Sequence, residues 1–266
     1  MHTLKDAIYG LAIGDALGVP YEFMPRGSFK ACGMDGYGTH NMPAGTFSDD
    51  TSLALATCDS IKQCKQINID YMRSCFKEWY IHGKYAIDGE VFDVGNATAK
   101  AIEKGYGLNS EYSNGNGSLM RIIPLAFIDN ITDDEIEAVS AITHAHEVSK
   151  SICVSYVRLA IDLINGLSIS KAIKKLPKEY QVTNLPLEEI NSSGYVVDTF
   201  RASLWTLANT NTFKECVLKA VNMGDDTDTT AAVTGALAGI VYGFEAIPKE
   251  WIYTLRGKDI IENCLF

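Results

Sequence analysis

A chain of 266 residues, with 47% hydrophobic and 21% charged residues, has the composition of an ordinary globular protein. Its formal net charge of -10 argues against binding to nucleic acid or anionic lipid, because both depend on Lys and Arg side chains that neutralise phosphate. No run approaches the roughly 18 to 20 apolar residues of a membrane-spanning helix, and the first residues lack a signal-peptide pattern. The seven cysteines form no C-x-x-C pair, which favours free thiols in a reducing compartment. We therefore expect a cytoplasmic protein without a membrane segment.

Helical periodicity recurs along the chain, whereas the alternation typical of strands is scarce. It predicts helices over residues 4–17, 53–64, 68–80, 94–104, 118–127, 133–143, 148–167, 195–208, 212–222 and 229–242. Residues 20–45 are rich in Gly and Pro and predict a long loop, which we expect to form a flap over a site. A second irregular stretch, residues 176–194, is expected to be peripheral. The fold class is therefore all-α, as a single compact orthogonal helical bundle that forms one domain over residues 1–266.

Two clusters of carboxylate and hydroxyl residues lie far apart in the sequence, each at the start of a predicted helix. They are Ser48-Asp49-Asp50-Thr51 and Asp225-Asp226-Thr227-Asp228-Thr229. A helix cap explains one aspartate well and three poorly. Carboxylates packed this closely repel one another unless a counter-charge relieves them, and all-oxygen ligands favour Mg²⁺, Mn²⁺ or Ca²⁺ over Zn²⁺. We expect the clusters to face each other across two cations, between two helix N-termini.

Two other interpretations of the second cluster fail on its surroundings. The pattern Asp226-x-Asp228 matches the nucleophile motif of haloacid-dehalogenase-like phosphatases, but residues 216–221 predict a helix where that motif requires a strand. An EF-hand loop counted from Asp226 requires Gly at its sixth position and Glu at its twelfth. Ala231 and Leu237 occupy those positions.

The two clusters occur together with two further motifs, and the combination resembles the ADP-ribosylglycohydrolase family. The further motifs are Gly14-Asp15-Ala16-Leu17-Gly18-Val19-Pro20-Tyr21-Glu22 and Gly115-Asn116-Gly117-Ser118-Leu119-Met120-Arg121. All four follow the family's order and span nearly the whole chain. The resemblance implies an all-α fold, two Mg²⁺ or Mn²⁺ ions, and a metal-dependent hydrolase that releases ADP-ribose from a modified protein or an ADP-ribosyl small molecule.

The resemblance also assigns roles to individual residues. The metal ligands would be Ser48, Asp49, Asp50, Asp226, Asp228 and Thr229. The catalytic acid/base residues would be Glu22, which approaches the metals from the flap, and Asp93. The substrate-binding residues would be Asn96, Gly115, Asn116, Gly117, Ser118 and His144, with the Gly115 to Ser118 backbone opening a helix and cradling a diphosphate.

Plainer interpretations of several of these residues stay open at this point. Taken alone, Asp93 predicts a helix cap, His144 a structural histidine, and Arg121 a structural ion-pair partner. Asp225 stands where the family usually has Gly, which leaves the ligand set around it open.

The Asp93 to Asn96 segment is similar to one that lines the distal ribose in family members acting on ADP-ribosyl-arginine, so the resemblance implies ADP-ribosyl-arginine as the substrate. The alternatives are another ADP-ribosyl or phosphoester substrate, or ADP-ribose binding without catalysis. The acceptor, the choice between Mg²⁺ and Mn²⁺, and the identity of the acid/base residue are left open, and a monomer is favoured.

Overall fold

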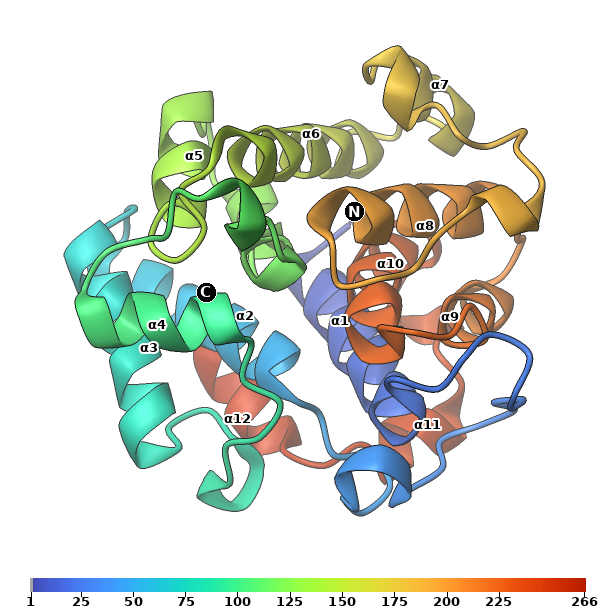
Figure 1. The fold of residues 1–266 in the computed structure, drawn as a ribbon, viewed down its shortest axis with the longest axis horizontal. Coiled ribbons are helices and arrows are strands. Elements are labelled where there is room, and N and C mark those ends of the chain that lie inside the picture. Colours follow the sequence, from blue (N-terminus) through green and yellow to red (C-terminus); the bar gives the residue numbers. More distant parts are fainter. Residues whose placement is uncertain (1) are drawn as a thin grey trace.

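The computed structural model describes residues 2–266, which form helices and loops with isolated β-bridges and no sheet. Figure 1 shows the helices packed around a central pair, α1 and α10. The bounds are α1 Leu4–Gly18, α2 Asp49–Cys64, α3 Ile69–His82, α4 Asn96–Lys104, α5 Asp133–Ser140, α6 Glu147–Ile164, α7 Ile169–Lys174, α8 Val196–Ala208, α9 Phe213–Val221, α10 Thr227–Tyr242, α11 Lys249–Thr254 and α12 Lys258–Cys264. The expected all-α fold is confirmed.

One predicted helix is wrong. Residues 118–127 do not form an α-helix but two short 3₁₀ turns, Asn116–Ser118 and Ile123–Phe127. Pro124 lies within the second turn, and a proline has no N–H to donate inside a helix and clashes with the preceding turn. The apolar spacing that predicted a helix here instead reflects burial, since Leu119, Ile122 and Ile123 are fully buried.

Small residues let α1 and α10 approach with their backbones in contact. A Cβ atom added at Gly10 would lie 2.1 Å from the carbonyl oxygen of Gly235, and one at Gly14 would lie 2.0 Å from that of Ala231. Neither position tolerates a side chain, which is a requirement that glycine alone satisfies. The contact continues to the end of α1, where a Cβ at Gly18 would lie 2.3 Å from the Cα of Asp228. The N-terminus of α10 is therefore held against the C-terminus of α1.

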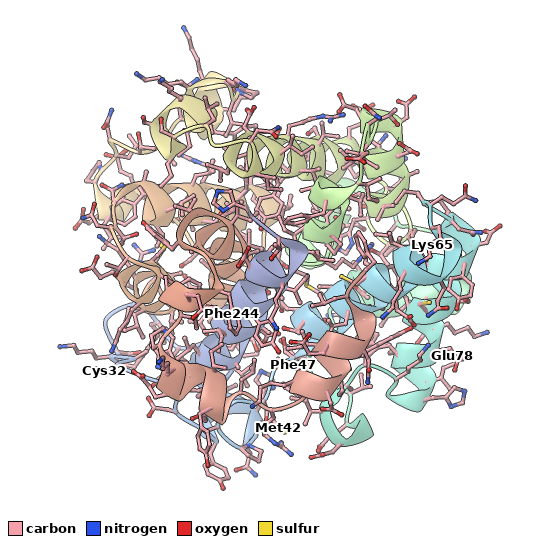
Figure 2. The ribbon with its side chains drawn as sticks, turned by 180° about the vertical axis from the view of Figure 1, so that it is seen from behind. Cys32, Met42, Phe47, Lys65, Glu78 and Phe244 are labelled. Atoms are coloured by element: carbon pink, nitrogen blue, oxygen red, sulfur yellow. The ribbon has the colours of Figure 1, made fainter. Side chains whose placement is uncertain are left out.

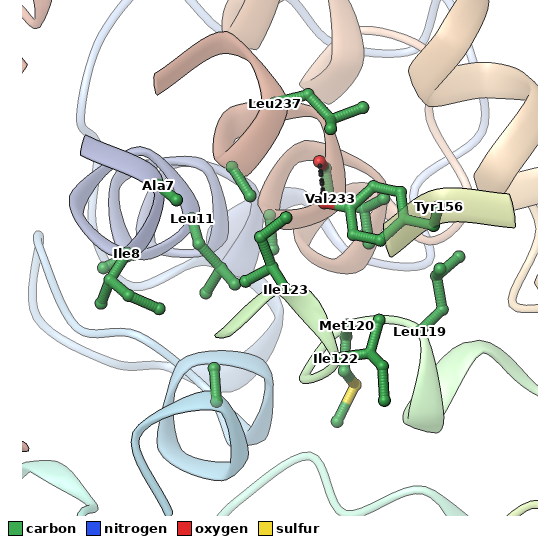
Figure 3. Packing of buried hydrophobic residues seen from close by; sticks show 14 of the residues in the cluster. Ala7, Ile8, Leu11, Leu119, Met120, Ile122, Ile123, Tyr156, Val233 and Leu237 are labelled. Atoms are coloured by element: carbon green, nitrogen blue, oxygen red, sulfur yellow. Dashed lines mark hydrogen bonds between the residues drawn. The ribbon is translucent and has the colours of Figure 1, made fainter. Parts of the chain in front are cut away.

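The hydrophobic core surrounds this pair. Figure 3 shows Leu11 of α1 and Leu237 of α10 near Ile123 of the 3₁₀ segment, with Tyr156 of α6 beside them. The Tyr156 hydroxyl donates a 2.9 Å hydrogen bond to the carbonyl oxygen of Val233, so this buried phenol is satisfied within the core. One cluster of buried residues includes members of helices from α1 to α12.

The segment before α2 is the expected long loop, and hydrogen bonds fix it to the α9–α10 connection. The Phe23 N–H donates to the Asp225 carbonyl at 2.7 Å, and the Asp225 N–H donates to the Met24 carbonyl at 2.9 Å. The Arg26 guanidinium donates to the Met223 carbonyl at 2.7 Å and to the Leu187 carbonyl at 2.9 Å. The flap is therefore tied to Met223 and to Asp225, at the start of the second acidic cluster.

The remaining features of the fold are the packing of Phe47, the state of the cysteines and the length and polarity of the helices. Phe47, labelled in Figure 2, leads into α2 and is buried. A Cβ added at Gly257, at the start of α12, would lie 3.0 Å from its ring. All seven cysteines are free, and five of them are buried. Within residues 2–266, every helix is too short or too polar to cross a lipid bilayer.

Candidate metal and substrate site

Helix α1 positions the N-termini of both helices that carry the acidic clusters. The buried Asp15 carboxylate accepts hydrogen bonds from the Ser48 N–H at 2.9 Å, the Thr51 N–H at 3.0 Å and the Thr51 hydroxyl at 2.6 Å. Three residues further along α1, the Gly18 carbonyl accepts a 2.8 Å hydrogen bond from the Thr227 hydroxyl. Burial raises the pKa of Asp15 to about 6, although these donors act in the opposite direction.

The two acidic clusters meet, as the sequence predicts. The Asp50 carboxylate accepts hydrogen bonds from the Ser48 hydroxyl at 3.2 Å and from the Thr229 hydroxyl at 3.3 Å, which joins α2 to α10. Ser48 also caps α2 by accepting from the Asp50 N–H, and Asp226 caps α10 by accepting from the Thr229 N–H. Capping and ligation are compatible here, because an oxygen that accepts one hydrogen bond in a cap keeps a second lone pair, and the Asp226 carboxylate has a second oxygen as well.

Within residues 2–266, the carboxylates of Asp49, Asp50 and Asp228 form no ion pair with a Lys or Arg side chain. Burial, followed by the charges of neighbouring carboxylates, raises the pKa values of Asp49, Asp50 and Asp228 well above their usual range. One oxygen of Asp50 and one of Asp228 are buried without a hydrogen-bond partner among residues 2–266. Buried, unpaired oxygen donors of this kind fit hard divalent cations.

Glu22 reaches the centre from the flap. Glu22, Asp226 and Asp228 each place a carboxylate oxygen within 4.8 Å of the others, and Glu22, His40 and Asp93 form a second group of the same size. Burial raises the pKa of Glu22 to about 8, with the charge of Asp226 as the next cause, and raises that of Asp93 to about 7. Both values lie close to neutral pH, where a carboxyl group can donate or accept a proton.

Asp93 is not a helix cap. Helix α4 begins at Asn96 with Gly95 as its N-cap, and no side chain caps it. Asp93 has φ of +56°, the left-handed region that non-glycine residues seldom adopt. Such strain is common at functional sites.

His40 is a site residue that sequence reasoning missed. Its Nε2 atom hydrogen-bonds to Glu22 and lies 3.9 Å from an oxygen of Asp93. The signal that could have found it is its place in the Gly-rich flap, where it is the only histidine of residues 20–45.

A cavity of about 390 Å³ opens above the metal centre, a volume within the range of small-molecule sites. Its walls include most of the residues expected to bind metal or substrate: Glu22, Asp49, Asp93, Asn96, Gly115, Asn116, Gly117, His144, Asp226 and Thr229. Asn116 connects the two groups, because its amide donates to the Asp226 carboxylate at 2.8 Å and to the Thr199 hydroxyl at 2.9 Å.

Ser118 lies apart from this cavity. Its hydroxyl accepts a 3.0 Å hydrogen bond from Ser140 and lies 3.5 Å from the Cys153 sulfur, inside the core. The backbone expected to cradle a diphosphate therefore forms a 3₁₀ turn, not the expected helix start.

The stretch expected to be peripheral borders the site at its end, so that expectation is wrong for residues 192–194. The Ser192 carbonyl accepts from the Asp226 N–H at 3.0 Å, and the Gly194 carbonyl accepts from the Asn116 N–H at 3.0 Å. Gly194 also lines the cavity. These contacts join segments that are distant in sequence, which local periodicity does not encode.

The backbone conformation at position 225 explains why Asp can stand there in place of Gly. It adopts φ of +58°, a conformation for which glycine is the usual residue and which aspartate tolerates better than most. Its side chain is exposed and belongs to neither group of converging carboxylates. The departure from the family pattern thus changes the surface more than the metal centre.

These observations define an all-α protein with a buried centre of carboxylates that could hold metal ions, beside a cavity of about 390 Å³. The sequence profile of the ADP-ribosylglycohydrolase family matches residues 3–265. The chain is 34% identical to ADP-ribosylarginine hydrolase Tri1 of Serratia proteamaculans, over 97% of this chain and 76% of that protein. It is 32% identical to the ADP-ribosyl-[dinitrogen reductase] glycohydrolase of Rhodospirillum rubrum, over 95% and 90% of the two chains.

A solved structure described as an ADP-ribosylglycohydrolase-related protein complex superposes with a TM-score of 0.83 and 29% identity, over 97% of this chain and 93% of that one. The chain therefore belongs to the ADP-ribosylglycohydrolase family and is a hydrolase of glycosidic bonds.

Proposed function

We propose that the protein releases ADP-ribose from ADP-ribosyl-arginine side chains with the help of two divalent cations, Mg²⁺ or Mn²⁺. The observation that carries this proposal is one cavity lined by Asp93 and Asn96, by the carboxylates of both clusters, and by the Gly115–Gly117 turn. The name of the Serratia proteamaculans relative supports arginine as the acceptor.

The cations would be held by the six oxygen-donor residues Ser48, Asp49, Asp50, Asp226, Asp228 and Thr229. When bound, they supply positive charge that orients ribose hydroxyls and lowers the pKa of nearby water. Asp50 and Thr229 are already in contact, so the two halves of the ligand set are preorganised.

Asp93 and Glu22 would move the protons. The bond between C1 of the distal ribose and the guanidine nitrogen breaks, and its electron pair leaves with the nitrogen, which takes a proton from the protonated member of the pair. Positive charge develops on the ribose, and the surrounding carboxylates stabilise it. Water then forms the new bond at C1 while the other carboxylate accepts its proton. The pKa values of about 8 and 7 allow one member to be protonated while the other is ionised.

The test compares release of ADP-ribose from an ADP-ribosyl-arginine protein by the wild type, Asp228→Ala and Asp70→Ala. Asp70 is a matched control, because it also lies in the first turn of a helix, α3, but has a 96% exposed side chain. We expect Asp228→Ala to lose at least about 10³-fold in turnover, since a metal contributes several kcal/mol of transition-state stabilisation. Unchanged turnover by Asp228→Ala would contradict the proposal.

The same assay decides the substrate. Serine-linked ADP-ribose and simple phosphoesters are run in parallel, each with Mg²⁺ and with Mn²⁺. Faster release of ADP-ribose from the serine linkage would replace arginine as the assigned acceptor. Phosphate release from the phosphoester, without release of ADP-ribose, would instead favour a phosphoester as the substrate.

A further inference from the structure

Arg121 is a buried cation that the proposed chemistry does not use. Its side chain is completely buried and lies 4.4 Å above the ring of Phe76. It forms no ion pair within residues 2–266, so the expectation of a structural ion-pair partner is wrong. Its Nε and Nη1 atoms have no hydrogen-bond partner there either. A buried, unpaired charge is costly, and a chain that keeps one calls for a reason.

The one side chain to which Arg121 donates is Thr143, at 2.8 Å from Nη2 to the threonine hydroxyl oxygen. The same hydroxyl oxygen lies 2.8 Å from Nδ1 of His144. Arginine has no acceptor, so the oxygen must accept from Arg121. The hydroxyl hydrogen then finds its acceptor in Nδ1, because no other partner contacts this hydroxyl in the described chain. All three side chains are satisfied at this contact when Nδ1 of His144 carries no hydrogen.

A neutral imidazole without a hydrogen on Nδ1 carries it on Nε2. His144 lines the cavity, and its Nε2 atom lies 3.6 Å from the place where a Cβ on Gly115 would stand. No residue among 2–266 accepts a hydrogen bond from Nε2. Burial, assisted by the charge of Arg121, lowers the pKa of His144 to about 3, which is consistent with a neutral ring.

We propose that Arg121 and Thr143 are positioning residues that lock His144 as an Nε2–H donor facing the cavity beside the Gly115–Gly117 turn. The group bound there must then be a hydrogen-bond acceptor, and the buried Arg121 charge favours an anionic one, such as a diphosphate oxygen of the ADP-ribosyl substrate. The assignment of that ligand rests on the proposed function, whereas the state of the His144 ring does not.

The first experiment needs no substrate. In the 266-residue, Mg²⁺-loaded protein with ¹⁵N-labelled histidine, NMR at pH 7 distinguishes the two neutral tautomers and the imidazolium, and His144→Gln identifies the signal among five histidines. We expect the wild type to show the Nε2–H tautomer alone. An Nδ1–H ring or an imidazolium would overturn the proposal.

Two variants test the relay itself. Thr143→Val removes the hydroxyl and should yield mixed tautomers, while Thr143→Ser should keep the wild-type spectrum. Arg121→Met frees the hydroxyl oxygen to accept from Nδ1–H and should also mix the tautomers, and Thr143→Val decides the case if Arg121→Met does not fold. The matched control is Thr206→Val, a buried threonine whose hydroxyl donates to the Ala202 carbonyl within α8 at 2.7 Å. An unchanged Nε2–H signal in Thr143→Val would overturn the relay.

The ligand is tested by calorimetric titration of ADP-ribose. Thr143→Val should bind about 10-fold more weakly than Thr143→Ser or Thr206→Val, as expected for a weakened hydrogen bond to a charged group. Equal affinities would overturn the assignment of His144 as a ligand donor. No binding to the wild type, with the expected tautomer in place, would contradict the proposed function and leave the relay standing.

Discussion

The two ends of the cavity differ in the sign of the charge that the protein places there. At the metal end, carboxylates from α2, α10 and the flap crowd together with raised pKa values, and within residues 2–266 no Lys or Arg forms an ion pair with Asp49, Asp50 or Asp228. At the other end, glycine backbone and the neutral His144 line the wall, and the cation, Arg121, is buried behind them. Under the proposed function, cations from solution act where hydroxyls and water are activated, and the buried Arg121 charge lies near the place where an anion is held. A ligand with a ribose at one end and phosphates in the middle can bind in one orientation.

The proposed difference between the two ends is tested most strongly by removing the Asp93 carboxylate, which would transfer protons at the metal end. Asp93→Asn should lower kcat by roughly 10² to 10⁴-fold with little change in KM, because general acid–base catalysis contributes that much. Asp88→Asn is the matched control, since Asp88 also has a positive φ, +55°, but lies outside the cavity. Measuring both variants on the arginine-linked substrate checks this, and equal rates for Asp93→Asn and Asp88→Asn would remove Asp93 from the mechanism.

Removing the metal should reveal the electrostatic repulsion among the carboxylates at the metal end of the cavity. Glu22, Asp93 and Asp15 have pKa values of about 8, 7 and 6 in the folded chain, against about 4 when unfolded, so the folded state holds protons that the unfolded state has lost. The chelator-treated protein should therefore lose stability as pH rises from 5 to 8, and its Tm should fall by at least about 3 °C.

Added Mg²⁺ should raise the Tm more at pH 8 than at pH 6, because it replaces protons that are bound more weakly at high pH. Thermal melts with and without chelator measure both effects. If the Tm of the metal-free protein instead rises over this pH range, the repulsion between the carboxylates is relieved by something other than bound protons.

The His144 end of the cavity can be tested by adding one methyl group at Gly117. A Cβ at Gly117 would lie 2.9 Å from both Cε1 of His144 and the Thr98 hydroxyl, so Gly117→Ala should displace the ring and raise KM about 10-fold, as expected for overpacking. Gly33→Ala is the control, because nothing lies within 4 Å of its Cβ. Steady-state kinetics on both variants tests this, and a lower kcat with an unchanged KM would place Gly117 in the chemistry instead of in binding.

The smallest effect is expected at Asp225. Asp225→Gly restores the residue usual in the family, and its backbone hydrogen bonds to Phe23 and Met24 are retained. Relief of the positive φ and the greater freedom of the unfolded chain oppose each other, so the free energy of unfolding should change by less than about 1 kcal/mol. Denaturant unfolding and turnover are the measurements, and a clear loss of activity would give the Asp225 carboxylate a function at the site.

The sequence predicted the parts of this molecule that local pattern encodes. The N-termini of α2 and α10, with their acidic clusters, follow from capping residues and apolar spacing, and the all-α class follows from the same periodicity. Helices α7, α11 and α12 were missed because six or seven residues are too few to establish a period. That the 266 residues form one domain stays a prediction, supported by the core cluster shared from α1 to α12.

Contacts between distant segments were the harder part of the site. Nothing local distinguishes Asp15 from any other helical aspartate, yet its carboxylate orders the first cluster. Likewise, His40 and Gly194 acquire their places through the flap and the α8 approach, which fold onto residues far along the chain.

The glycine contact between α1 and α10 has a consequence for how the metal centre can adapt. One helix fixes both acidic clusters, and it touches α10 through main-chain atoms, which have no rotamers with which to accommodate a new spacing. The distance between the two ligand clusters is therefore fixed by contacts between main-chain atoms. Adjustment to substrates of different size must come from the opposite wall, where a 3₁₀ turn and single side chains can shift without moving a helix.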